Sequence, residues 1–131
     1  MILVDSCGWL EAIKGDGLAA AYAPALAEPD EVLVPTVCVL EVARVMRRER
    51  GEQAAADAVS AMTLGTVAPL DVALAAAAAF LGARTALPGA DSVIYATAQA
   101  HGNAACSPRN AADAASVTSS GTTVPLSLIH I

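Results

Sequence analysis

The apolar and polar positions at the start of the chain predict a short buried strand that stops at an acid. Met1 to Val4 are all apolar, and four residues without a polar break fit a strand covered on both faces. Ser6 can then cap a helix that carries Trp9 and Ile13. Asp5 is therefore either part of a helix start or, because ligands gather at the carboxyl ends of parallel strands, the first wall of a site.

The same kind of pattern repeats along the first hundred residues. Val32 to Pro35 reads as a second buried strand, and Gly65 to Leu70 as a third. Strands that alternate with helices indicate an α/β domain, in which helices pack on a parallel sheet. Six helices are expected. The first ends at Gly15, and the others are Leu18–Leu26, Thr36–Arg50, Gln53–Met62, an alanine-rich helix from Asp71 to Arg84, and Ala90–Ala100. Thr36 and Asp71 are the expected N-caps of their helices, and Gly51 ends the Thr36–Arg50 helix.

Composition narrows the class of protein. A chain of 131 residues fits one domain with a single core. No apolar run approaches the roughly 20 residues of a membrane span, and the N-terminus does not resemble a signal peptide. Three cysteines without metal-ligand spacing favour a reduced, cytoplasmic protein. A net charge of −6 argues against broad phosphate binding and suits either carboxylates around a metal or a basic partner.

Glu41 is one of the few charged residues inside an otherwise apolar helical stretch, Val37 to Met46, which also holds Arg44. Glutamate and arginine are rarely buried unless they are paired. One interpretation is a pair between Glu41 and Arg44, three residues apart, worth about 0.2–0.5 kcal/mol. The other is that Glu41 points from a buried helix into a polar cleft. The residues alone leave both open.

Asp91 opens a late helix, directly after the break at Leu87 to Gly89. An acid in a first helical turn is favoured by the helix dipole, by ~0.3–1 kcal/mol, and for a lone aspartate that explanation suffices. Asp5, Glu41 and Asp91 can nevertheless meet at one edge of a parallel sheet. Carboxylates crowded together repel, so such a cluster needs a cation. Oxygen-only ligands select Mg²⁺ or Mn²⁺, which can activate a water and neutralise charge on a phosphate.

These segments resemble the PIN-domain family, in particular the VapC-like ribonuclease toxins of toxin–antitoxin pairs. The matching residues are Ile2 to Ser6, Val34 to Thr36 followed by Leu40 to Val42, and Leu87 to Ala98. The resemblance covers Met1 to about Gly102. It implies a three-layer α/β/α fold with a short parallel sheet, Mg²⁺-dependent cleavage of RNA, neutralisation by an antitoxin inserted near the site, and a homodimer as a common assembly.

Carried over position by position, the resemblance makes Asp5, Glu41 and Asp91 the core acids, which would bind the metal. The family places a fourth acid after the next strand. Asp113 is the candidate here, with Asn110 as its neighbour. The threonine and phenylalanine that flank the family pattern are absent, so Asp113 matches only part of it.

The C-terminal end departs from the family. Asn103 to Thr123 are rich in Ala, Ser, Thr and Asn and show no periodicity, so composition indicates loop or disorder and the loss of the normal C-terminal strand or strands. We therefore divide the chain into a PIN-like domain, 1–113, and an aberrant tail, 114–131. Leu126 to Ile131 can be encoded by CTGTCTCTTATACACATC, a transposon end used in preparing sequencing libraries. A frameshift followed by read-through would explain this tail, and resequencing an independent clone would decide it.

Two other functions compete with the ribonuclease. A catalytically inactive PIN-like module that binds an antitoxin or another chain would suit the incomplete fourth-acid motif. A receiver-type phosphoacceptor aspartate is disfavoured, because Lys14 is the only lysine and such a site needs one late in the chain. Four arginines end the Thr36–Arg50 helix, where they either complement the helix dipole or contact RNA or the antitoxin. They are Arg44, Arg47, Arg48 and Arg50.

Overall fold

A computed structural model describes residues 2–15, 17, 19–87, 89–102, 104–106, 116–119 and 122–125. Its centre is a four-stranded parallel sheet with the strand order β3-β2-β1-β4. The strands are β1 (Ile2–Val4), β2 (Val32–Pro35), β3 (Thr66–Ala68) and β4 (Ala104–Cys106). β1 pairs with β2 on one side, Leu3 opposite Leu33, and with β4 on the other. The first strand of the chain is therefore an interior strand of the sheet.

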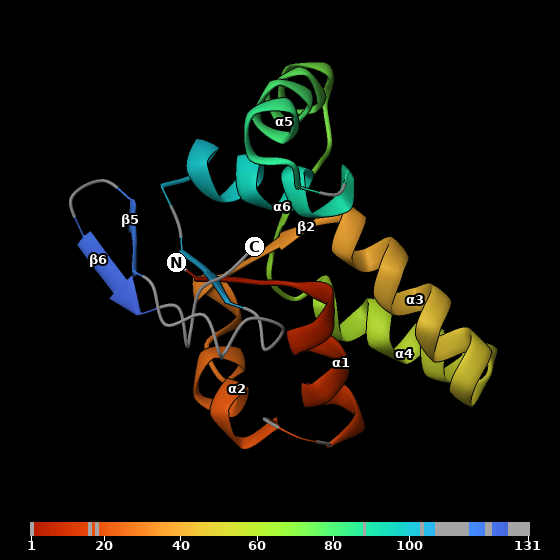
Figure 1. Cartoon of the computed structure of the whole chain (residues 1–131). Helices are drawn as coiled ribbons and strands as arrows, with labels where there is room; N and C mark the ends of the chain where they lie inside the picture. Colours follow the sequence, from red (N-terminus) through yellow and green to blue (C-terminus); the bar gives the residue numbers. More distant parts are fainter. Residues whose placement is uncertain are drawn as a thin grey trace.

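Helices cover the sheet on both sides (Figure 1), which confirms the three-layer α/β/α architecture. The α1–α2 pair lies on one side of the sheet and the α5–α6 pair on the other, while α3 and α4 pack together as an antiparallel pair. The helices are α1 (Ser6–Lys14), α2 (Ala19–Leu26), the short 3₁₀ helix η1 (Pro29–Glu31), α3 (Thr36–Arg50), α4 (Glu52–Met62), α5 (Val72–Thr85) and α6 (Gly89–Ala100).

The core forms where the two interior strands meet the helices. Leu3, Val4, Leu33 and Val34 are completely buried, and Trp9 packs against the same cluster. A strand buried on both faces loses the alternation of apolar and polar residues, which is why these strands read as short continuous apolar runs. A smaller cluster joins α5 to α6 and consists of Leu74, Ala78, Leu81 and Ala96.

The interpretation of everything from Asn103 to Thr123 as loop was wrong in part. Ala104–Cys106 form β4, in parallel register with β1, and Ser116–Ser119 (β5) pair antiparallel with Thr122–Pro125 (β6). A strand at a sheet edge needs only backbone hydrogen bonds to its neighbour, so small residues without an apolar pattern can form one. The division of the chain at residue 113 and the origin of the tail stay predictions.

The start of α3 differs from the expected one, and the start of α5 agrees with it. Pro35, not Thr36, is the N-cap residue of α3, and the Thr36 hydroxyl instead accepts a hydrogen bond from the Leu70 backbone N–H at 3.2 Å. Asp71 does cap α5, because its Oδ1 accepts from the Leu74 N–H at 2.8 Å, as expected from the sequence. Thr36 thus ties the segment after β3 to the end of β2, where the chain enters the helices.

No single helix in the described part of the chain has the length and apolar composition of a membrane span. The helices α5 and α6 reach these limits only when they are counted together, as a pair bent by 114°.

The burial of β2 predicts a large stability difference between two leucines. Leu33 is completely buried, whereas the side chain of Leu64 is 68% exposed. We expect Leu33→Ala to lower the free energy of unfolding by about 2–5 kcal/mol, because it leaves a cavity between the sheet and its helices. Leu64→Ala should change it by less than about 0.5 kcal/mol. Urea unfolding followed by circular dichroism measures both, and equal losses would contradict this description of the core.

Candidate active site

Asp5 lies at the carboxyl end of β1 and is only 5% exposed. It is the N-cap residue of α1, and its Oδ1 accepts a hydrogen bond from the Gly8 backbone N–H at 3.0 Å. The sequence analysis gave this capping role to Ser6, which was wrong because Ser6 is already the first residue of the helix. Capping fixes the Asp5 carboxylate at the end of the central sheet, so the two interpretations of Asp5 are compatible.

The Ser6 hydroxyl has a different partner, the second sequence-predicted acid. Ser6 Oγ donates a hydrogen bond to Glu41 Oε2 over 3.0 Å, although the two residues are 35 positions apart. The other carboxylate oxygen of Glu41, Oε1, is buried and has no hydrogen-bond partner. Among the described residues, no ion pair joins Glu41 to Arg44, which is exposed. Glu41 therefore points from α3 towards the start of α1 and does not pair along its own helix.

The thiol of Cys38 is affected by both Asp5 and Glu41. This thiol is completely buried in the core. Burial raises the pKa of the Cys38 thiol well above its ordinary value, and the charges of Asp5 and Glu41 raise it further. The two negative charges therefore act on the same thiol. The sequence analysis treated Cys38 only as a small hydrophobe, although its position three residues before Glu41 on a helix placed it on a neighbouring part of the same surface.

Asp91 and Asp113 are the other two acids that the sequence analysis selected. Asp91 is a half-buried residue in the first turn of α6, next to Ser92, whose hydroxyl donates to the Gly89 carbonyl over 2.8 Å. Within the described ranges, no three His, Cys, Asp or Glu side chains come together closely enough to hold a metal ion. Asp113 lies outside the described residues. The structure therefore brings Asp5 and Glu41 together, and the roles of Asp91 and Asp113 stay predictions.

The Asp5–Glu41 pair fits a divalent cation. A buried carboxylate oxygen without a partner, such as Glu41 Oε1, is costly unless a donor or a cation satisfies it. Mg²⁺ is commonly held by only one or two carboxylates, because it keeps several of its waters. The neighbouring Cys38 thiol stays protonated since its pKa is raised, and a protonated thiol is a poor metal ligand. The donor set is thus oxygen-only, which suits Mg²⁺ or Mn²⁺.

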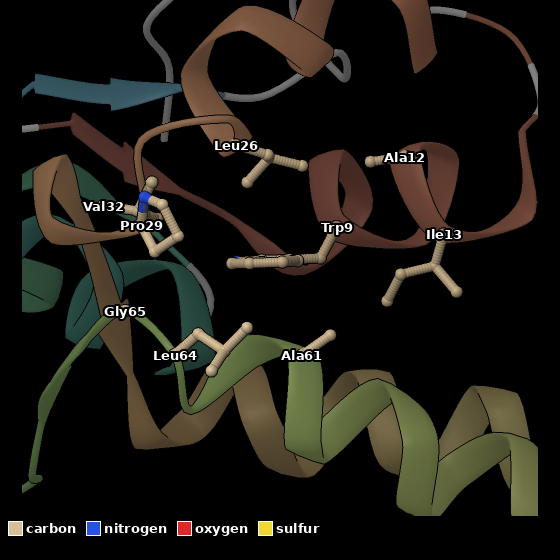
Figure 2. A pocket seen from close by; sticks show the side chains of 9 residues that line it. All are labelled: Trp9, Ala12, Ile13, Leu26, Pro29, Val32, Ala61, Leu64 and Gly65. Carbon is tan, nitrogen blue, oxygen red and sulfur yellow. The ribbon is translucent and has the colours of Figure 1, made fainter.

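An apolar pocket lies at the other side of α1, with a volume of about 240 Å³. Figure 2 shows the Trp9 indole lying across it, with Leu26 on one side of the ring and Leu64 on the other. The indole Nε1 is buried and has no hydrogen-bond partner. None of the described residues that line this pocket is an acid, so the pocket is separate from Asp5 and Glu41. Its lining residues are Trp9, Ala12, Ile13, Leu26, Pro29, Val32, Ala61, Leu64 and Gly65.

Comparison with known proteins gives one family and two related folds. A family model for the PIN domain matches residues 2–106. The toxin VapC20 of Mycobacterium tuberculosis, described as a sarcin–ricin loop cleaving toxin, has a TM-score of 0.72 at 18% identity, over 95% of this chain and 100% of its own. A toxin–antitoxin complex from Klebsiella pneumoniae has a TM-score of 0.69 at 19% identity, over 83% of this chain and 87% of its own. The comparison with curated proteins finds no match.

The buried thiol predicts how stability depends on pH. Because the pKa of Cys38 is raised in the folded chain above the ordinary value of 9.0, the unfolded chain loses this proton first as the pH rises. The free energy of unfolding should then fall above about pH 9, with a slope of at most about 1.4 kcal/mol per pH unit.

The matched comparison is Cys38→Ala, in which this part of the decrease should vanish. Urea unfolding of both chains between neutral and alkaline pH measures it. Parallel pH profiles would mean that the pKa of the Cys38 thiol is not raised in the folded chain.

Proposed function

The chain belongs to the PIN-domain family, and on that premise we propose that it is an endoribonuclease that hydrolyses phosphodiester bonds with Mg²⁺ or Mn²⁺, as the toxin of a toxin–antitoxin pair. The observation that carries the proposal is the buried Glu41 Oε1, which has no hydrogen-bond partner and belongs to a carboxylate that faces the same thiol as Asp5. A cytoplasmic location and a homodimer stay predictions of the same proposal.

Each carboxylate is oriented by a neighbouring group of the chain. The Gly8 N–H holds Asp5 Oδ1, and the Ser6 hydroxyl holds Glu41 Oε2, so Oε1 is the oxygen left for a cation. Asp5 and Glu41 would hold the ion, with Asp91 and Asp113 as further acids whose positions the proposal requires nearby. When bound, a divalent ion there supplies activation of a water and neutralisation of the charge that develops on the phosphate.

Ser6 acts on this arrangement as a positioning residue. Its hydroxyl fixes one rotamer of a glutamate that comes from a different helix. A metal site must hold its ligands in a defined geometry, and hydrogen bonds to the ligands commonly tune the affinity for the ion. The bond between Ser6 and Glu41 therefore links the end of β1 to α3 at the point where the cation would bind.

A second candidate function is a binding module without catalysis. It is favoured by the lack, among the described residues, of three ligand side chains close enough to hold one ion. In this case Asp5 and Glu41 would shape a surface for another chain, and no cleavage would accompany binding. The two functions differ in one measurable property, the dependence of RNA cleavage on the acids and on the metal.

Cleavage of a pool of cellular RNA should require both the metal and the two acids. We expect the chain to cleave with Mg²⁺ and to stop in EDTA. Asp5→Asn keeps a capping side chain, and Glu41→Gln keeps the shape of the side chain, yet each should lower the rate by on the order of a hundredfold or more, as expected when a charge-stabilising group is lost.

The control is Asp57→Asn, which changes an exposed acid of α4 and should leave the rate unchanged. Unaltered cleavage in EDTA, or in both site variants, would exclude the metal site. No cleavage by any form of the chain would favour the binding module.

We also propose a cognate antitoxin protein as the partner. The fold of the chain is similar to that of one chain in a toxin–antitoxin complex. Its described surface has a pocket beside Trp9 that fits an apolar side chain. Burying one large apolar side chain there would contribute roughly 1.5–3 kcal/mol.

A charge at the mouth of this pocket should weaken the complex. We expect the product of the neighbouring gene to co-purify with this protein when the two are co-expressed. Leu64→Asp should reduce the amount that co-purifies by tenfold or more, because binding would remove water from the aspartate against an apolar side chain of the partner. Leu70→Asp alters a leucine that is also exposed but does not line the pocket, and it should retain the complex. Equal retention by both variants would place the antitoxin elsewhere.

A further inference from the structure

Positive charge gathers on one short segment of an otherwise acidic chain. The sequence holds 7 Lys and Arg against 13 Asp and Glu. Four of the arginines lie on the last two turns of α3, namely Arg44, Arg47, Arg48 and Arg50, and all four are exposed. This helix also carries Glu41. The position of each arginine around the helix, relative to Glu41, therefore determines whether it lies beside the candidate active site.

Helical geometry separates these arginines into two groups. With 3.6 residues per turn, successive side chains are rotated by about 100°, so Arg48 lies about 20° and Arg44 about 60° from the direction of Glu41. Arg47 lies about 120° away from that direction. The buried residues Cys38, Val42 and Met46 lie about 60° to 140° from Glu41 in the other direction around the helix. Arg44 and Arg48 thus continue the open side of α3 that begins at Glu41, and we call these two residues the arginine ridge.

The arginines of the cluster differ in their ion pairs. Arg47 forms an ion pair with Glu52 over 3.5 Å. Arg48 contacts Glu49 over 3.7 Å. The side chains of both pairs are exposed, and exposed pairs are weak enough to be exchanged. Among the ion pairs of the described residues, none involves Arg44. Arg44 is therefore an exposed cation, one helical turn from Glu41, that is available to an anion.

An anionic polymer such as RNA needs exposed positive charge near Asp5 and Glu41 to approach this site. The chain carries a net charge of −6, and Asp5 and Glu41 add negative charge where a phosphate would have to come. A local cluster of arginines offsets this repulsion and binds phosphate through paired N–H donors. The two ridge residues lie about 6 Å apart along the helix axis, so both can bind phosphates of the same strand.

We propose that the arginine ridge, Arg44 and Arg48, binds the phosphates of the RNA strand next to the bond that is cleaved, and so positions the strand across Glu41. This inference rests on the proposed ribonuclease function and names how the substrate is held. An acidic protein is the other class of partner that would fit two exposed arginines. RNA is favoured because the ridge continues from the carboxylates that would act on a phosphodiester.

The test measures binding without cleavage. Fluorescence anisotropy of a labelled oligouridylate, titrated with the full chain in EDTA, gives the affinity at several salt concentrations. We expect Arg44→Gln to weaken binding by about tenfold, the equivalent of one charge-assisted hydrogen bond. The double variant Arg44→Gln with Arg48→Gln should lower the slope of log affinity against log salt by about 1.4, since each phosphate contact to a single strand contributes about 0.7.

Two variants serve as matched controls. Arg47→Gln removes the same charge from the same helix, but on a different side, and Arg84→Gln removes an exposed arginine from α5. Both should keep the affinity of the parent chain within about twofold. The cleavage assay is independent, so a chain that binds RNA through the ridge but cleaves nothing would contradict the proposed function and support the ridge.

Three results would overturn the proposal. The first is a parent chain that does not bind the oligouridylate. The second is a loss in Arg47→Gln or Arg84→Gln as large as that in Arg44→Gln, which would indicate general charge attraction. The third is a double variant that retains RNA binding but loses affinity for polyglutamate, which would assign the ridge to an acidic protein.

Discussion

The hydrogen bond from Ser6 to Glu41 joins the two parts of the molecule on which the candidate site depends. It connects the first turn of α1, which follows the interior strand β1, to α3, which follows β2. One carboxylate oxygen accepts this bond, and the other is buried without a partner. Holding such an oxygen next to Asp5 is unfavourable in the absence of a cation. The free energy gained by burying the apolar core on both faces of the sheet offsets this cost.

The fold could be predicted well from the sequence because its signals are local. Continuous apolar runs at Ile2–Val4 and Val32–Pro35 indicate strands buried on both faces, and Asp71 and Gly51 mark helix ends that the structure confirms. The strand β4 could not be predicted in this way. Ala104–Cys106 are small residues, and they form a strand because the edge of β1 offers backbone hydrogen bonds, a long-range property that no local pattern records.

The site could be predicted only in part, for a similar reason. Residue type and spacing selected Asp5, Glu41 and Asp91 as candidate acids, and the Ser6–Glu41 hydrogen bond brings the second of them to the residue after Asp5. They did not show that Ser6 bonds to Glu41 or that the charges of both acids act on the Cys38 thiol, because both effects depend on how α1 packs against α3. Asp91 is on a helix that contacts α3, but helix contact does not place a side chain. The role of Asp91 as a metal-binding acid rests on the resemblance to the family, and among the described residues Asp91 is not grouped with Asp5 and Glu41 closely enough to hold one metal ion.

Binding of a divalent ion tests the central claim most directly, since it requires neither the RNA target nor the antitoxin. The measurement is the thermal unfolding of the parent chain and of Glu41→Gln in increasing Mn²⁺ or Mg²⁺. An ion held by Asp5 and Glu41 should raise the unfolding temperature of the parent, with a stabilisation of about 2.7 kcal/mol at a hundred times the dissociation constant. Glu41→Gln should show little of this increase. The same ion-dependent increase in both chains would contradict the account.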